Sequence, residues 1–118
     1  MKNGVSAIIF FTLFISTLNA SDFKLNMLFV ESEHCRWCEK MDNEIFENEK
    51  IATDLRNMYE IKKVKRGSKE IPKFIKPKYY PTTYILSSDS KKLIDELPGY
   101  MKPERFMEYV TELYDLEK

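Results

Sequence analysis

The chain has 118 residues and carries 19 basic and 19 acidic side chains, so its formal net charge is zero. This length allows one small domain with a modest core. Because there is no basic excess, we do not expect nucleic acid to be a general partner.

Residues 1–20 predict a secretory signal peptide. Lys2 supplies the positive start, Val5 to Leu18 is apolar, and Ala20 is a small residue at the expected cleavage site. The apolar run is too short for a comfortable membrane span, although an uncleaved anchor stays open. We therefore expect export, and a mature domain at residues 21–118 that does not span a membrane.

The mature domain begins with a predicted strand and two helices. Residues 25–30 form a nearly continuous apolar run, which is typical of a strand covered on both faces. After a short loop, Cys38, Met41 and Ile45 recur at helical steps. Asn48 is a residue type that caps helices, and a second helical pattern follows it.

The middle of the chain predicts a weak strand at residues 60–65, after which Gly67 interrupts the pattern. Residues 71–75 fit a short helix or an irregular segment. Residues 62–78 hold eight Lys or Arg and one Glu, whereas residues 39–49 are mainly acidic. This asymmetry could steer a charged partner, although two solvated faces are the simpler interpretation.

The last part of the chain predicts a hairpin and a helix. A strand from Thr82, a turn at residues 87–90 and a partner strand at residues 91–97 form the hairpin. Pro103 suits the first turn of a helix that ends near Leu116. Strands joined through helices should be parallel, and hairpin strands antiparallel. The expected fold is therefore α/β, with a mixed four-stranded sheet flanked by helices on both faces.

The only two cysteines, Cys35 and Cys38, lie at the predicted start of the first helix. Residues three apart are neighbours on a helix, so their sulfurs can close a disulfide or open to a dithiol with little backbone movement. The free N–H groups and the dipole of the helix start stabilise a thiolate, which is the attacking species. We predict that Cys35 attacks and that the more covered Cys38 resolves the mixed disulfide.

Other uses of the cysteine pair are less favoured. A disulfide across three residues restricts the unfolded chain little, which makes a purely structural bond a weak interpretation. Zinc needs about four ligands, and covalent haem needs a histidine directly after Cys38, where Glu39 stands. A copper site of His34 with both thiolates stays open. We otherwise expect no metal and no cofactor.

Three neighbours of the cysteines are candidates for tuning or binding. His34 is the only histidine and can transfer protons near neutral pH, or it is simply an exposed loop residue. Arg36 favours a thiolate at Cys35 by its charge, whereas Glu33 opposes it. Trp37 offers an apolar platform to a partner, or it covers the start of the helix.

Three motifs in this order resemble the thioredoxin superfamily. They are the Cys35-Arg36-Trp37-Cys38 motif after the first strand, Pro81 before the third strand and Gly99 after the fourth. The resemblance implies thiol–disulfide exchange, a cis Pro81 that faces the cysteines, and a substrate chain that pairs with the backbone beside it. Together with Trp37 as an apolar platform, Tyr80 and Pro81 are the predicted substrate-binding residues, although structural packing is the simpler interpretation of Tyr80.

The Lys40-Met41 pair after the second cysteine and the Tyr80-Pro81-Thr82-Thr83 motif most resemble small exported thioredoxin-like proteins. The chain departs from thioredoxin itself. Phe29 stands where thioredoxin has a buried Asp that aids proton removal, so Glu31, Glu39, Lys40 or water must take that role. His34 replaces a Trp before the first cysteine.

The expected function is an exported, periplasmic thiol–disulfide oxidoreductase that reduces disulfides in partner proteins. Its partners would be protein thiols or disulfides, together with a membrane electron donor. A thiol oxidase of the same fold, or a non-catalytic module that carries a metal or a partner, remains the alternative.

Overall fold

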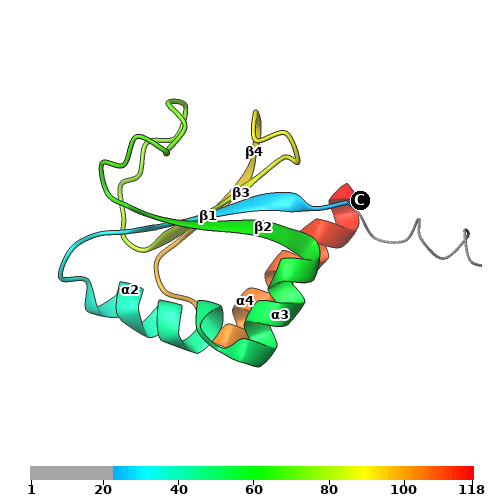
Figure 1. Cartoon of the computed structure of the whole chain (residues 1–118), viewed down its shortest axis with the longest axis horizontal. Helices are drawn as coiled ribbons and strands as arrows, with labels where there is room; N and C mark the ends of the chain where they lie inside the picture. Colours follow the sequence, from blue (N-terminus) through cyan, green and yellow to red (C-terminus); the bar gives the residue numbers. More distant parts are fainter. Residues whose placement is uncertain (1–22) are drawn as a thin grey trace, which may run out of the picture.

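The computed structural model describes residues 23–118, which form a four-stranded sheet in the order β2-β1-β3-β4 (Figure 1). The pairing of β1 with β2 is parallel, and the pairings of β1 with β3 and β3 with β4 are antiparallel. The mixed sheet is confirmed. The predicted signal peptide at residues 1–20 lies outside the described residues. The strands are β1 (Leu25–Glu31), β2 (Tyr59–Lys65), β3 (Thr82–Leu86) and β4 (Leu93–Pro98).

The helices begin where the capping residues predict. The side chain of Asn48 accepts a hydrogen bond from the Ile51 N–H at 3.2 Å, and Pro103 occupies the first turn of the last helix. The first helix continues into a π-helical turn, which a pattern of three- and four-residue steps does not reveal. The helical elements are α2 (Arg36–Met41), η2 (Asp42–Phe46), α3 (Glu49–Met58) and α4 (Pro103–Glu117).

All of these helices pack on one face of the sheet, which we call the helix face (Figure 1). Met27 and Phe29 point from β1 into this core, because alternate side chains of a strand face the same way. Phe106 and Val110 of α4 are fully buried against them. The Tyr59 hydroxyl donates a hydrogen bond to the Val110 carbonyl at 2.6 Å, which ties α4 to the start of β2.

The opposite face of the sheet is covered by residues 66–80, which form no regular helix. Ile75 is 4 % exposed and packs with the side chains of β1, β2 and β3 that point away from the helices. The expectation of helices on both faces is therefore wrong for the described part of the chain. Pro72 and Pro77 explain the difference, since proline lacks an N–H and disfavours helical backbone in the residue before it.

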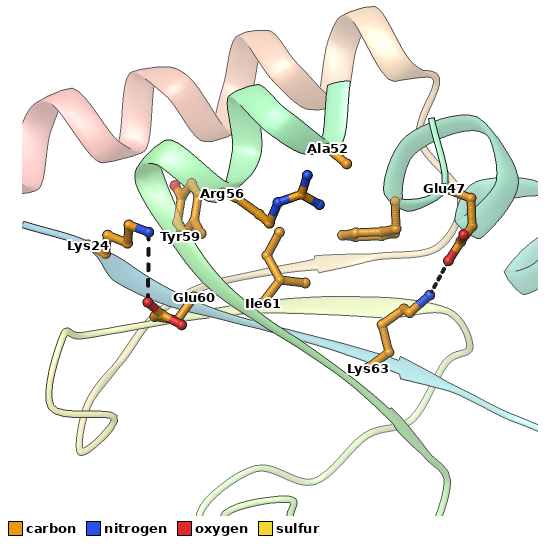
Figure 2. A pocket seen from close by; sticks show the side chains of 9 residues that line it. Lys24, Glu47, Ala52, Arg56, Tyr59, Glu60, Ile61 and Lys63 are labelled. Atoms are coloured by element: carbon orange, nitrogen blue, oxygen red, sulfur yellow. Dashed lines mark hydrogen bonds and ion pairs between the residues drawn. The ribbon is translucent and has the colours of Figure 1, made fainter. Parts of the chain in front are cut away.

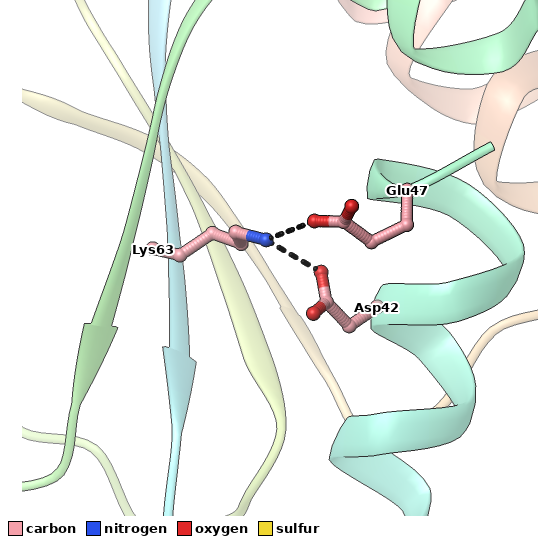
Figure 3. A network of polar contacts seen from close by, with 3 residues as sticks. All are labelled: Asp42, Glu47 and Lys63. Carbon is pink, nitrogen blue, oxygen red and sulfur yellow. Dashed lines mark hydrogen bonds and ion pairs between the residues drawn. The ribbon is translucent and has the colours of Figure 1, made fainter. Parts of the chain in front are cut away.

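A lysine on β2 ties the end of the first helix to the sheet (Figure 3). The Lys63 Nζ lies 2.9 Å from Asp42 Oδ1 and 2.7 Å from Glu47 Oε2. Partial burial lowers the pKa of Lys63, but the hydrogen bonds to both carboxylates outweigh it and raise the pKa overall. These two ion pairs hold η2 against β2.

Within residues 23–118, no helix is both long enough and apolar enough to cross a membrane.

Candidate active site

Cys35 caps the N-terminus of α2, and it forms a disulfide with Cys38. The two Cα atoms are 5.2 Å apart, and the Cys38 N–H donates a hydrogen bond to Cys35 Sγ at 3.2 Å. Cys38 is 1 % exposed, whereas Cys35 is partly exposed. The same N–H can stabilise a thiolate on Cys35 after reduction, so the accessible sulfur is the one prepared for attack.

The motif residues that are far apart in sequence meet at these cysteines. The Tyr80–Pro81 peptide bond is cis, and the Tyr80 carbonyl oxygen lies 3.8 Å from Cys35 Sγ. The sulfur carries no proton in the disulfide, so this is a contact and not a hydrogen bond. The Gly99 N–H donates to the Pro81 carbonyl at 2.7 Å, which fixes the loop after β4 against the start of β3.

Trp37 projects from α2 beside the cysteines and is 55 % exposed. Its ring centroid lies 5.2 Å from that of Tyr100, so one side of the indole rests on the loop before α4. Both sequence interpretations therefore apply in part, because Trp37 covers the start of the helix and still offers an apolar surface. The residue remains a predicted substrate contact.

A polar network that the sequence did not reveal supports Trp37. The Tyr100 hydroxyl donates to Glu44, and Lys40 forms an ion pair with Glu44 at 2.7 Å. The hydrogen bond to Glu44 raises the pKa of Tyr100, and the hydrogen bond from Lys40 lowers the pKa of Glu44. A spacing of four residues is typical of a helical pair, so Lys40 and Glu44 carry a local signal, but nothing in the sequence places Tyr100 beside them.

The other residues that the sequence analysis singled out near the cysteines differ in exposure. His34 and Arg36 are exposed, and the backbone of His34 adopts a positive φ of 54°. Phe29 is fully buried, so an apolar ring occupies the position of the thioredoxin Asp. Burial raises the pKa of Glu31, although Lys65 opposes this effect. Of the proposed carboxylate substitutes for the Asp, Glu31 is partly buried, whereas Glu39 is exposed.

Among residues 23–118, no three His, Cys, Asp or Glu side chains lie close enough together to hold a metal ion. The copper arrangement that joins His34 to both cysteines is therefore not present as a group in this structure.

A cavity of about 370 Å³ lies between α3 and β2, where Arg56 and Ile61 line it (Figure 2). Its lysines are paired, Lys24 with Glu60 and Lys63 with acidic partners. None of the residues that line the cavity is a residue predicted for the active site. The cavity is therefore separate from the candidate active site.

Two sequence comparisons give different results. A family model described as a thioredoxin-like domain matches residues 16–113. No curated protein matches the chain.

Solved structures of similar fold are numerous. The periplasmic thioredoxin SoxS from Paracoccus pantotrophus is 18 % identical, with a TM-score of 0.65 over 80 % of this chain and 100 % of that one. A thioredoxin from Thermus thermophilus is 17 % identical, with a TM-score of 0.63 over 76 % of this chain and 73 % of that one. A disulphide isomerase from Xylella fastidiosa Temecula1 is 17 % identical, with a TM-score of 0.59 over 87 % and 89 %. At these identities the likeness shows the fold alone.

Proposed function

We propose that this chain, which belongs to the family of thioredoxin-like domains, is an exported thiol–disulfide oxidoreductase that reduces disulfides in partner proteins. The observation that carries the proposal is the position of the cysteine pair. The accessible Cys35 caps α2, the buried Cys38 lies one turn behind it, and the Tyr80 carbonyl borders the sulfur. A purely structural disulfide has no need of an accessible sulfur or of a bordering backbone acceptor.

The exchange transfers two electrons from the cysteine pair to the partner. The Cys35 thiolate attacks one sulfur of the partner's disulfide, whose S–S bond breaks, and the second partner sulfur leaves as a thiolate that takes up a proton. Cys38 then gives up its proton and attacks Cys35 Sγ in the mixed disulfide. The Cys35–Cys38 disulfide forms, and the partner leaves as a dithiol.

The groups around the pair have assigned roles in this cycle. The Cys38 N–H and the start of α2 stabilise the Cys35 thiolate. The backbone at Tyr80 and Pro81 holds the substrate chain, and Trp37 gives it an apolar contact. The exposed Arg36 favours the thiolate by its positive charge, and the exposed His34 transfers protons.

The direction and the compartment are the finer parts of the proposal. Reduction is supported by the resemblance to small exported thioredoxin-like proteins, and export by the signal peptide pattern at residues 1–20. One similar structure is described as a periplasmic thioredoxin. In that compartment a reductase needs electrons from a membrane donor.

The reduction potential of the cysteine pair against glutathione tests the direction. A value near about −270 mV supports a reductase, and a value near about −120 mV would make the protein a disulfide donor. Fractionation of cells that express the whole chain, with and without residues 1–20, tests export. Recovery of both forms in the same compartment would contradict it.

Two single variants test the roles of the cysteines in an insulin reduction assay. Cys35→Ser should abolish exchange, because the attacking sulfur is gone. Cys38→Ser should accumulate mixed disulfides with partner proteins, because the first step proceeds and the second cannot. Exchange that survives in Cys35→Ser would overturn the assigned nucleophile. Copper bound at one ion per chain, without insulin reduction, would instead favour a carrier.

A further inference from the structure

Residues 66–80, which we call the basic segment, carry an excess of positive charge. Their single carboxylate, Glu70, is paired with Lys62 at 3.1 Å. Within the described residues, none of the cations of the segment forms an ion pair. These five exposed side chains are Arg66, Lys69, Lys73, Lys76 and Lys78.

The same segment presents apolar surface among these charges. A hollow of about 330 Å³ lies along it, with Ile71, Ile75 and Tyr80 in its lining and with Lys73 and Lys76 at its edge. Two aromatic side chains stand out from the segment, Phe74 at 50 % exposure and Tyr79 at 65 %. Large exposed aromatic groups on the same segment as a hollow are typical of a surface that binds another chain.

Tyr80 makes the basic segment continuous with the candidate active site. It lines the hollow, and its carbonyl oxygen lies 3.8 Å from Cys35 Sγ. The Arg66 guanidinium lies 5.9 Å from the centre of the Tyr80 ring, so a cation stands at the junction. A polypeptide that places its disulfide on Cys35 therefore meets positive charge and apolar surface on this side.

We propose that the basic segment is a docking surface for an acidic stretch of the substrate protein, with an apolar side chain of that stretch seated in the hollow. This inference rests on the proposed function and names the class of substrate that it favours. Opposite charge would raise the rate of encounter, and the apolar contact would hold the acidic stretch while the sulfurs react.

The experiment compares two disulfide-bonded peptides that share their cysteines and a leucine but carry flanking Glu or flanking Lys. The measured quantity is the ratio of kcat/KM for the acidic peptide to that for the basic peptide. We expect a ratio of at least about 10 at low salt, which is the lower end of electrostatic steering. The ratio should fall toward one at high salt, where the Debye length shrinks to about 3 Å.

A matched pair of variants locates the effect. The Lys73→Glu/Lys76→Glu variant reverses two charges at the edge of the hollow and should bring the ratio to one or below. The Lys91→Glu/Lys92→Glu variant makes the same change of net charge at the exposed hairpin between β3 and β4, and should keep most of the preference. An equal fall in both variants would overturn the docking surface, because net charge alone would then explain the preference.

Two further measurements separate this inference from the proposed function. Hydroxyethyl disulfide is small and uncharged, so a wild-type protein that fails to exchange with it contradicts the oxidoreductase and not the docking surface. Docking is then decided by the Kd of an acidic peptide with Ser in place of Cys. Tighter binding to the wild type than to the Lys73→Glu/Lys76→Glu variant supports the surface, and equal binding overturns it.

Discussion

The two faces of the sheet bury their side chains under different kinds of cover. In the described part of the chain, eleven residues form the core of the helix face, whereas six form the core beneath the basic segment. Helices α3 and α4 satisfy their own backbone groups, but the basic segment relies on isolated turns such as the bond from the Ile75 N–H to the Pro72 carbonyl at 2.9 Å. We therefore expect the helix face to supply more of the stability, and the basic segment to be the more deformable cover of the two.

The largest expected effect comes from the helix face. Phe106→Ala removes a fully buried ring from the face of α4 that packs on the sheet, and should lower the free energy of unfolding by about 3–5 kcal/mol. Urea denaturation of the oxidised protein measures it. Leu116→Ala, on the same helix but 75 % exposed, is the control and should change stability by less than about 0.5 kcal/mol.

A smaller loss is expected under the basic segment. Ile75→Ala should cost about 2–3 kcal/mol, the lower part of the usual range, because an irregular segment can collapse onto the space left behind. Phe74→Ala, at the half-exposed neighbouring position, should leave the urea midpoint nearly unchanged. If Ile75→Ala cost as much as Phe106→Ala, the two faces would be equally rigid and the comparison would fail.

Adjacent threonines on β3 allow the two faces to be compared at one place. The Thr83 hydroxyl is buried on the helix face without a hydrogen-bond partner in residues 23–118, whereas the Thr82 hydroxyl donates to the Tyr79 carbonyl at 2.7 Å. Thr83→Val should therefore raise the free energy of unfolding by about 1 kcal/mol, and Thr82→Val should lower it by about the same amount. Thermal unfolding of both variants tests this. A loss of stability in Thr83→Val would show that its hydroxyl has a bonding partner.

The smallest expected effect depends on pH and concerns Glu31, at the end of β1. Burial raises the pKa of this carboxyl in the folded protein above its ordinary value of 4.5, although Lys65 lowers it. The folded state therefore keeps a proton that the unfolded state has released. The contribution of Glu31 to the free energy of unfolding should decrease as the pH rises from 4.5 through the folded-state pKa, and it should stay lower above that interval.

Glu31→Gln removes this titration, so its stability should exceed that of the wild type at neutral pH and approach it in acid. Glu33→Gln, at an exposed position two residues further on, is the matched control. Unfolding curves measured at several pH values test the difference. A difference in stability between the wild type and Glu31→Gln that rises over the same interval would contradict the burial of Glu31. A change in the pH dependence of exchange in Glu31→Gln alone would also connect this carboxyl to proton removal from Cys38.

Local signals in the sequence predicted much of the fold and of the candidate site. The apolar run of β1, the cap at Asn48 and the spacing of Cys35 and Cys38 each depend on residues near in sequence, and each is found where it was expected. The resemblance implied that Pro81 would be cis and would face the cysteines, and the contact between Tyr80 and Cys35 agrees with this.

The remaining features depend on tertiary contacts that no local pattern encodes. Lys63 meets Asp42 only because β2 lies beside η2, and Tyr100 meets Glu44 only because the loop before α4 returns to η2. Within the basic segment, which covers the face of the sheet opposite the helices, residues 71–75 were predicted only as a short helix or an irregular segment. Pro72 and Pro77 prevent a regular helix there, and the segment forms few local hydrogen bonds.

Within residues 23–118, the order β2-β1-β3-β4 leaves one side of β2 and one side of β4 unpaired. An unpaired strand edge is a template for aggregation, and lysine, proline and irregular register are the usual protection against it. On β2, Lys62 and Lys65 are exposed, while β4 ends at Pro98 and its register with β3 shifts near Ile85. Both edges of the sheet are therefore protected against the addition of another strand, which leaves the backbone at Tyr80 as the place where we propose that a substrate chain pairs.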